Sequence, residues 1–109
     1  MIHADFFISR SGRLRGFTVC GHAAKNARDR QGELLCAAVS GAAYCVANTL
    51  LKLPGVSPKI QVSCGKMRLR LCRQDEWNPV CATVLKGFLA HTRQLRRQYP
   101  ERIYVTVHG

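Results

Sequence analysis

Acidic residues are scarce in this chain of 109 residues. It has six Asp and Glu against 17 Lys and Arg, which leaves a formal net charge of +11 at pH 7. The chain therefore lacks the carboxylates to neutralise its own cations. This balance favours a polyanionic partner such as RNA, or an acidic substrate, and the charge alone leaves both alternatives open.

Long hydrophobic runs are also missing. Hydrophobic residues make up 47% of the sequence, enough for one core, but their runs are short and interrupted. We therefore expect no membrane-spanning segment. Repeats, low-complexity tracts and linkers are absent as well, and this length is typical of one domain. We expect a single domain over residues 1–109.

Cys-x-x-Cys pairs, the spacing typical of structural zinc sites, do not occur. The first eight residues lack the basic start and apolar stretch of a signal peptide, so we expect a reducing cytoplasm and free thiols rather than a disulfide framework. Cys20 and His22 come nearest to a metal-ligand pair, but two further ligands are missing. We therefore expect no metal and no cofactor. The cysteines are Cys20, Cys36, Cys45, Cys64, Cys72 and Cys81.

Five segments alternate apolar and polar residues, which predicts strands. The first two flank a turn at Ser11-Gly12 and the next two flank Cys64-Gly65-Lys66, so each pair is expected to form a hairpin. The apolar members of the five runs are, in order, Ile2 to Ile8, Phe17 and Val19, Ile60 and Val62, Met67 to Leu71, and Ile103 to Val107.

Apolar residues three and four apart predict two helices. One runs from Leu34 to Leu53, and the other begins at Asn78-Pro79 and ends before Pro100. The polar segment 23–32 has no apolar face and is expected to be an exposed, mobile loop. The order ββαββαβ predicts an α+β fold of two layers. Its mixed or antiparallel sheet of about five strands is covered by two helices.

Cys36 and His22 are the candidate catalytic pair. Cys36 falls in the first turn of the first predicted helix, where free backbone amides and the helix dipole favour a thiolate. His22 follows the second predicted strand and can reach back to this helix start. It would take the thiol proton as general base, Cys36 would attack a peptide carbonyl, and His22 would protonate the leaving amine. A cysteine in an Ala-rich helix also commonly fills a core, and this alternative stays open.

Two polar residues near Cys36 have candidate supporting roles. Ser40 lies one helical turn after Cys36 and shares its face, where it could hydrogen-bond near the site or only permit close packing. Glu33 could cap the helix or orient His22. Capping is favoured, because acidic residues are common in a first helical turn.

The segments Gly21-His22-Ala23, Gly32-Glu33 and Cys36-Ala37-Ala38-Val39-Ser40 resemble the signature GHA…G-D-x-x-C-A-A-V-S of the Prp family, the ribosomal-processing cysteine proteases. The expected element order is similar to that family along nearly the whole chain. The resemblance implies one cysteine protease domain with Cys36 as nucleophile and His22 as its partner. The family's supporting positions fall on Gly21, Glu33 and Ser40.

The same resemblance implies a substrate and an assembly. Such enzymes remove a short N-terminal extension from large-subunit ribosomal protein L-twenty-seven, and they are typically homodimers. The loop between the histidine and the cysteine is expected to move on substrate binding. Two features depart from the family pattern: Glu33 stands where Asp is usual, so its carboxylate lies one methylene further out, and the loop from His22 to Cys36 is longer.

Three function classes follow from these observations. The leading hypothesis is a cytoplasmic cysteine endopeptidase that acts on a ribosomal protein precursor during ribosome assembly. A non-catalytic basic RNA-binding α/β module associated with the ribosome is the alternative, although the GXXG loop and the aromatic strand pattern of common RNA-binding modules are missing. A redox-sensing thiol protein would need a resolving cysteine beside Cys36, for which Cys20 is the candidate. The basic residues expected to form one face toward ribosomal RNA are Arg68, Arg70, Arg93, Arg96 and Arg97.

Overall fold

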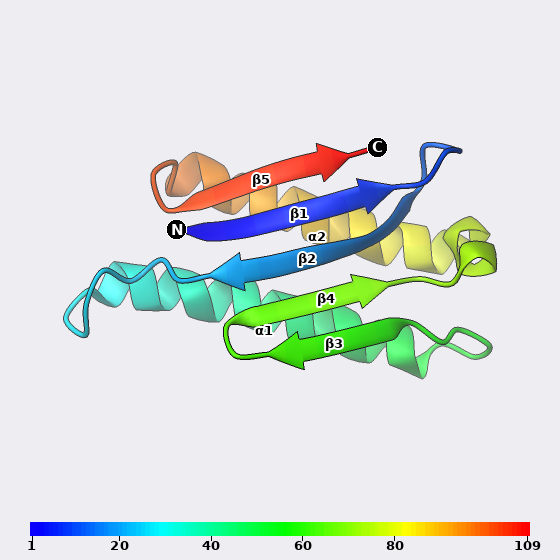
Figure 1. Ribbon diagram of the computed structural model, residues 1–109, viewed down its shortest axis with the longest axis horizontal. Coiled ribbons are helices and arrows are strands. Elements are labelled where there is room, and N and C mark those ends of the chain that lie inside the picture. The colour runs from blue at the N-terminus through cyan, green and yellow to red at the C-terminus, as the bar shows by residue number, and fades with distance from the viewer.

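One five-stranded sheet forms a layer of the structure, and two helices cover one of its faces (Figure 1). The computed structural model describes residues 1–109. The strands are β1 (Ile2–Ile8), β2 (Leu14–Gly21), β3 (Lys59–Ser63), β4 (Lys66–Arg70) and β5 (Ile103–His108). The helices are α1 (Arg30–Lys52), α2 (Pro79–Gln98) and a short 3-10 helix, η1 (Arg73–Trp77). The predicted α+β fold and the order ββαββαβ are confirmed, and η1 is an addition.

The sheet is mixed, with the strand order β3-β4-β2-β1-β5. β2 lies at its centre, and its neighbour β1 is antiparallel to β2 and parallel to β5. β4 pairs antiparallel with both β2 and β3. Both predicted hairpins are therefore present. The parallel β1–β5 pair needs a long crossover, which α2 completes by crossing behind the sheet (Figure 1).

Aromatic rings join α2 to the middle of the sheet. Phe6 on β1 pairs with Phe17 on β2, and Phe17 pairs with Leu69 on β4, so all three side chains share one face and are buried. The ring of Phe88 on α2 lies with its centroid 5.5 Å from that of Phe6 and 4.7 Å from that of Phe17. Each such buried side chain contributes about 1.5–3 kcal/mol of transfer free energy, which holds α2 against this face.

The helix α1 begins one turn earlier than predicted. Its N-cap is Asp29, whose Oδ1 accepts a hydrogen bond from the backbone N–H of Gly32 at 3.1 Å. The loop expected over 23–32 therefore ends at Asp29. The prediction that Cys36 lies in the first helical turn was wrong, because a start at Arg30 puts Cys36 in the second turn. An Asp N-cap was the missed signal.

By length and composition alone, α1 is long and apolar enough to cross a membrane, which the interrupted apolar runs of the sequence did not indicate. Core helices of globular proteins pass the same test, however. Leu35 and Val39 of α1 are buried with Ile2 and Ile103, and Leu50 is buried in the cluster that contains Phe17 and Leu69. The apolar stripe of α1 is thus covered by the sheet of its own chain.

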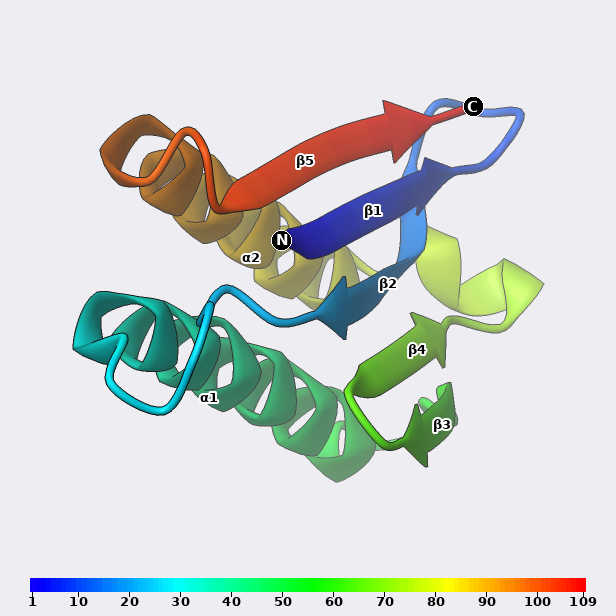
Figure 2. The same cartoon turned by 60° about the vertical axis from the view of Figure 1, so that its left-hand side comes forward.

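The opposite face of the sheet carries no helix (Figure 2). Met67 and Leu69 of β4 are buried on the helix side, so the alternate residues Arg68 and Arg70 point to the uncovered face. The three arginines of α2, at positions 93, 96 and 97, belong to the other layer. The prediction of one basic face was therefore wrong, because strand and helix periodicity divide these five residues between two layers.

Candidate active site

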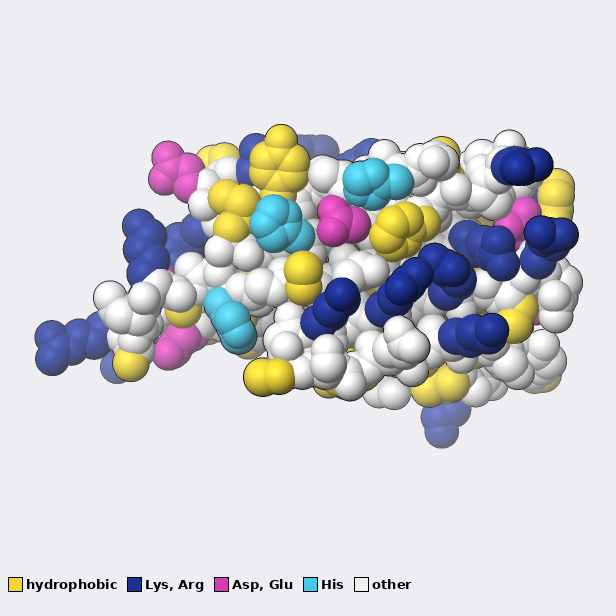
Figure 3. Space-filling model, viewed as in Figure 1, with side chains coloured by type: hydrophobic (Ala, Val, Ile, Leu, Met, Phe, Trp, Pro, Cys, Tyr) yellow, Lys and Arg dark blue, Asp and Glu magenta, His cyan; other side chains and the backbone are white.

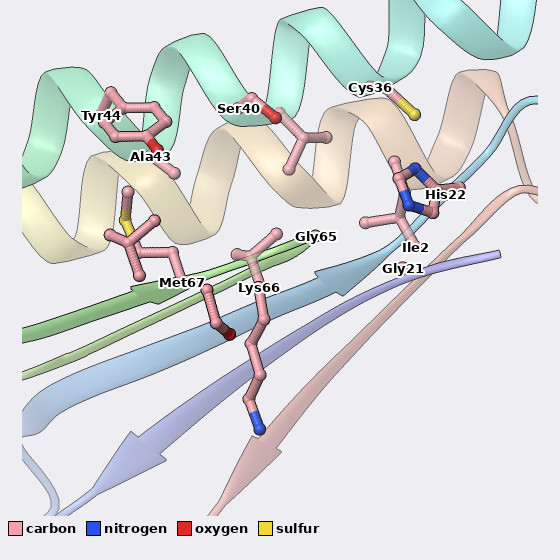
Figure 4. Close-up of a pocket in the computed structure, with 14 residues that line it drawn as sticks. Ile2, Gly21, His22, Cys36, Ser40, Ala43, Tyr44, Gly65, Lys66 and Met67 are labelled. Carbon is pink, nitrogen blue, oxygen red and sulfur yellow. The ribbon is translucent and has the colours of Figure 1, made fainter.

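His22 and Cys36 line the same cavity, of about 230 Å³, between α1 and the ends of β2 and β4. His22 is the first residue after β2, and Cys36 lies on α1. Figure 4 shows the sulfur of Cys36 pointing toward the imidazole of His22. The two side chains predicted to react together thus line one cavity at one end of the sheet, together with Gly21 and Ser40.

Gly21 sets the direction in which His22 leaves the sheet. Its φ of 99° lies in the left-handed region that favours glycine, and a Cβ there would stand 2.2 Å from the carbonyl oxygen of Met1. The backbone N–H of Gly21 donates to the carbonyl of Gly65 at 3.2 Å. A Cβ on Gly65 would lie 3.3 Å from Nε2 of His22, so the β3–β4 turn is in close contact with the imidazole.

The sulfur of Cys36 accepts a hydrogen bond from the backbone N–H of Ala23 at 3.2 Å. A donor aimed at a thiolate stabilises the charged form. In the second turn of α1, the amide of Cys36 itself belongs to the helical hydrogen-bond ladder, and the dipole effect is strongest in the first turn. The donor for the sulfur is therefore Ala23 in the preceding loop, rather than the free amides at the helix start.

Asp29 and Arg102 anchor the loop that carries His22 and Ala23. Oδ2 of Asp29 accepts from the backbone N–H of Lys25 at 3.0 Å and from Nη1 of Arg102 at 2.6 Å. The same Nη1 donates to the carbonyl of Ala23 at 3.4 Å. The hydrogen bond from Lys25, followed by those from Arg102 and Gly32, lowers the pKa of Asp29 from 3.8 to about 2. The carboxylate is therefore charged at any pH near neutrality.

This anchor was not among the predicted site residues. The cap preference of Asp before a helical pattern would have indicated Asp29. Arg102 had no signal, because its contacts with Asp29 and Ala23 span 73 and 79 residues of sequence.

Gly32 lets the loop lie against α1. A Cβ at this position would stand 2.5 Å from Cα of Ala24 and 2.7 Å from Nη1 of Arg102. Any side chain here would push the loop from the helix. The glycine two residues after the helix start is thus part of the same arrangement that places Ala23 next to Cys36.

Of the two polar supporting residues predicted near Cys36, one lines the cavity and the other does not. Ser40 lines the cavity one turn beyond Cys36, and its hydroxyl has no hydrogen-bond partner in the structure. Glu33 is exposed in the first turn of α1 and does not line the cavity. The capping role expected for Glu33 is taken by Asp29.

The remaining walls of the cavity are largely apolar. Val39 and Tyr44 come from α1, and Val62 and Met67 come from the β3–β4 hairpin. The periodic patterns that predicted the helices and strands did not indicate this cavity wall. An apolar side chain of a bound molecule could be covered here, next to the sulfur.

No second thiol stands beside Cys36. Cys20 pairs with His3 and Lys66 across the sheet, on the face opposite to that of its buried neighbours. Cys36 lies on the helix side, so Cys20 does not take the place of a resolving cysteine. All six cysteines are free thiols, and no group of three His, Cys, Asp or Glu side chains is placed to hold a metal ion.

Comparisons with known proteins identify the family and the fold of this chain. The family model described as cysteine protease Prp matches residues 1–104. Among solved structures, the ribosomal processing protease Prp of Staphylococcus aureus, in complex with a substrate peptide, is similar with a TM-score of 0.85 and 19% identity, over 98% of this chain and 99% of that chain. The same protease with a covalently linked product peptide gives a TM-score of 0.82, 21% identity and the same coverage.

A Streptococcus mutans protein is similar as well, with a TM-score of 0.84, 21% identity, and coverage of 100% of this chain and 99% of that chain. No curated protein sequence matches the chain significantly. At these identities the solved structures share the fold with this chain, and the family model carries the assignment to a family.

Proposed function

Because this chain belongs to the Prp family of cysteine proteases, we propose that Cys36 is its nucleophile and His22 its general base and acid, in one protease domain over residues 1–109. The observation that carries the proposal is that the two side chains line one cavity, with the sulfur pointing toward the imidazole (Figure 4). The hydrogen bond from Ala23 to the sulfur gives the thiolate a donor before substrate binds.

The reaction proceeds in two halves. His22 takes the thiol proton, and Sγ of Cys36 attacks the carbonyl carbon of the scissile peptide. When the C–N bond breaks, His22 donates its proton to the leaving amine and a thioester remains on Cys36. His22 then removes a proton from water, whose oxygen attacks the thioester carbonyl carbon. The C–S bond breaks, the carboxylic acid leaves, and His22 returns its proton to the sulfur of Cys36.

The proposed substrate is the precursor of large-subunit ribosomal protein L-twenty-seven, from which the enzyme removes an N-terminal extension. Two observations support this substrate class. The Staphylococcus aureus structures with the same fold are those of a ribosomal processing protease bound to peptides. The apolar cavity wall formed by Tyr44, Val62 and Met67 is suited to an apolar side chain of such an extension.

The proposed setting is the cytoplasm, at the assembling ribosome, with the enzyme as a homodimer. A net charge of +11 repels a basic ribosomal protein at long range, and ribosomal RNA near the particle would compensate for this repulsion. Six free thiols suit a reducing compartment. Leu34 and Leu51 leave large apolar areas exposed along α1, which supports a partner subunit on that side.

The decisive experiment compares wild type with Cys36→Ala and His22→Ala on a peptide that spans the predicted extension of the host protein, with cleavage followed by mass spectrometry. Both variants should lose cleavage. Cys45→Ala is the matched control, because Cys45 is an exposed thiol on the same helix and lies outside the cavity. If Cys36→Ala still cuts the peptide, the proposed nucleophile is wrong.

A further inference from the structure

The uncovered face of the sheet carries a row of cations. Lys66, Arg68 and Arg70 occupy alternate positions on β4, and Lys59 on β3 stands opposite Arg70 in the strand register. All four side chains are exposed, and the two ion pairs of the structure involve other residues. Figure 3 shows Lys and Arg gathered in a band across this face. We call these four residues the β4 cationic row.

The row has the geometry of a phosphate-binding track. Alternate residues of a strand are about 6.7 Å apart and point the same way, so the cations repeat at a fixed spacing. A hollow of about 230 Å³ is lined only by Lys59, Gln61, Arg68 and Arg70. A guanidinium group is planar and can bind two phosphate oxygens at once. This hollow is lined by cations and one amide and by no apolar side chain, and such groups are suited to binding the phosphates of a nucleic-acid backbone.

An exposed aromatic ring stands where the row ends. Beyond β4, Arg73 and Arg15 line a larger hollow of about 680 Å³ together with Trp77, which is 58% exposed. The guanidinium carbon of Arg13 lies 4.0 Å from the centre of the Trp77 ring, a cation–π contact that holds the ring on one side. Proteins that bind single-stranded nucleic acid combine cations along the backbone with aromatic rings on which bases stack.

The carboxylates along this face form hydrogen bonds or ion pairs with side chains outside the β4 cationic row. Oδ1 of Asp5 accepts a hydrogen bond from the hydroxyl of Thr106 at 2.5 Å, and it lies 3.7 Å from Nε2 of His108. Glu76, at the larger hollow, is buried, and its Oε1 accepts hydrogen bonds from the hydroxyls of Ser9 and Ser11 at 3.2 and 3.0 Å. Neither carboxylate neutralises the β4 cationic row, so the face keeps its positive potential.

We propose that this face binds single-stranded RNA, with phosphates along the β4 cationic row and a base stacked on Trp77. Single strands are favoured over duplexes, because stacking on a protein ring needs an unpaired base. An acidic peptide would use the cations but would gain nothing specific from the ring. Of the row, only Lys66 at its end also lines the cavity that holds Cys36, so RNA bound at Lys59, Arg68 and Arg70 leaves that cavity accessible. This inference goes beyond the proposed protease function, because it assigns a second binding surface.

The test is fluorescence anisotropy with a short labelled single-stranded RNA of mixed sequence, at several salt concentrations. Arg68→Gln/Arg70→Gln should weaken binding by about tenfold or more and reduce the slope of log affinity against log salt by about 1.4, for two phosphate contacts. Trp77→Ala should weaken binding by about tenfold through lost stacking. The matched control is Arg93→Gln/Arg97→Gln, which removes the same charge from α2 and should change affinity by about twofold at most.

The outcomes separate three explanations. Equal losses in the β4 and α2 double variants would show that net charge alone attracts RNA, and would overturn the proposal. So would unchanged binding by Trp77→Ala together with equally strong competition by polyglutamate, which would indicate an acidic protein partner. Peptide cleavage by all three variants should equal that of wild type. This readout distinguishes loss of the RNA surface from misfolding, whereas the anisotropy measurement does not depend on the proposed substrate.

Discussion

The backbone N–H of Ala23 donates a hydrogen bond to Sγ of Cys36 across 3.2 Å, from a residue that directly follows His22. One short segment therefore supplies both the imidazole and a donor for the sulfur. Any movement of the loop between β2 and α1 changes both at once. The contacts that hold this loop, above all those of Asp29 and Arg102, should therefore govern activity although neither residue touches the reacting atoms.

The first prediction concerns Asp29→Asn. An amide keeps the ability to cap α1 but loses the charge that binds Arg102, so the loop should loosen around His22. We expect kcat for peptide cleavage to fall about tenfold to a hundredfold, because small misplacements of catalytic groups are costly. KM should change much less. The matched control is Glu101→Gln, which removes one exposed carboxylate next to Arg102 in sequence and should keep the wild-type kcat. If Asp29→Asn also kept the wild-type kcat, Asp29 would have no positioning role.

The lowered pKa of Asp29 predicts how stability depends on pH. The carboxylate titrates near 2 in the folded protein and near 3.8 otherwise, so the folded state favours its charged form. Its contribution is fully present above about pH 3.8 and is lost as the pH falls toward about 2. The difference in unfolding free energy between wild type and Asp29→Asn should therefore be constant near neutrality and shrink in this window. Urea unfolding at a series of pH values measures it, and a difference that persists to pH 2 would refute the linkage.

A third prediction compares two glycines on α1. Gly32→Ala should lower both stability and cleavage, because its Cβ would stand 2.5 Å from the backbone of Ala24. Gly41→Ala is the matched substitution on the same helix, where a Cβ meets nothing within 4 Å. It should raise stability by about 0.5–1 kcal/mol through helix propensity. Thermal unfolding of the two variants would contradict this reading if both changes had the same sign.

The fold could be predicted closely because its signals are local. Alternation placed Phe6, Phe17 and Leu69 on one face, and the Asn78-Pro79 start of α2 is confirmed by hydrogen bonds from Val80 and Cys81 to the Asn78 side chain. The meeting of the Cys36 and His22 segments followed from strand and helix order. What failed depended on tertiary contacts, which leave no periodic trace in the sequence.

The contact between Asp29 and Arg102, which anchors the loop, shows why the sequence did not reveal it. Asp29 looked like one charge among several in a polar segment, and only the fold brings Arg102 from beside β5 to meet it. The error at the start of α1 has a different origin, because polar residues of a first turn carry no apolar periodicity and the local N-cap signal of Asp29 was missed. Likewise, counting basic residues did not reveal that β4 and α2 belong to different layers.

The last prediction concerns the reactivity of four of the six thiols. Burial, with a smaller effect from the charge of Asp75, raises the pKa of the Cys81 thiol above its ordinary value of 9.0. Cys45 and Cys64 are exposed. Because the thiolate is the reacting form, iodoacetamide added to the native protein near neutral pH should label Cys45 and Cys64 and leave Cys81 unlabelled.

Cys36 is the informative position in this experiment. It lines an open cavity, and its sulfur faces an imidazole and a hydrogen-bond donor, so it should be labelled faster than Cys45 and Cys64. A substrate peptide should protect Cys36 selectively, and His22→Ala should slow its labelling without changing that of Cys45. Mass spectrometry of proteolytic fragments over time measures all four rates. Labelling of Cys36 no faster than that of Cys45, with no effect of His22→Ala, would mean that the imidazole does not activate the sulfur.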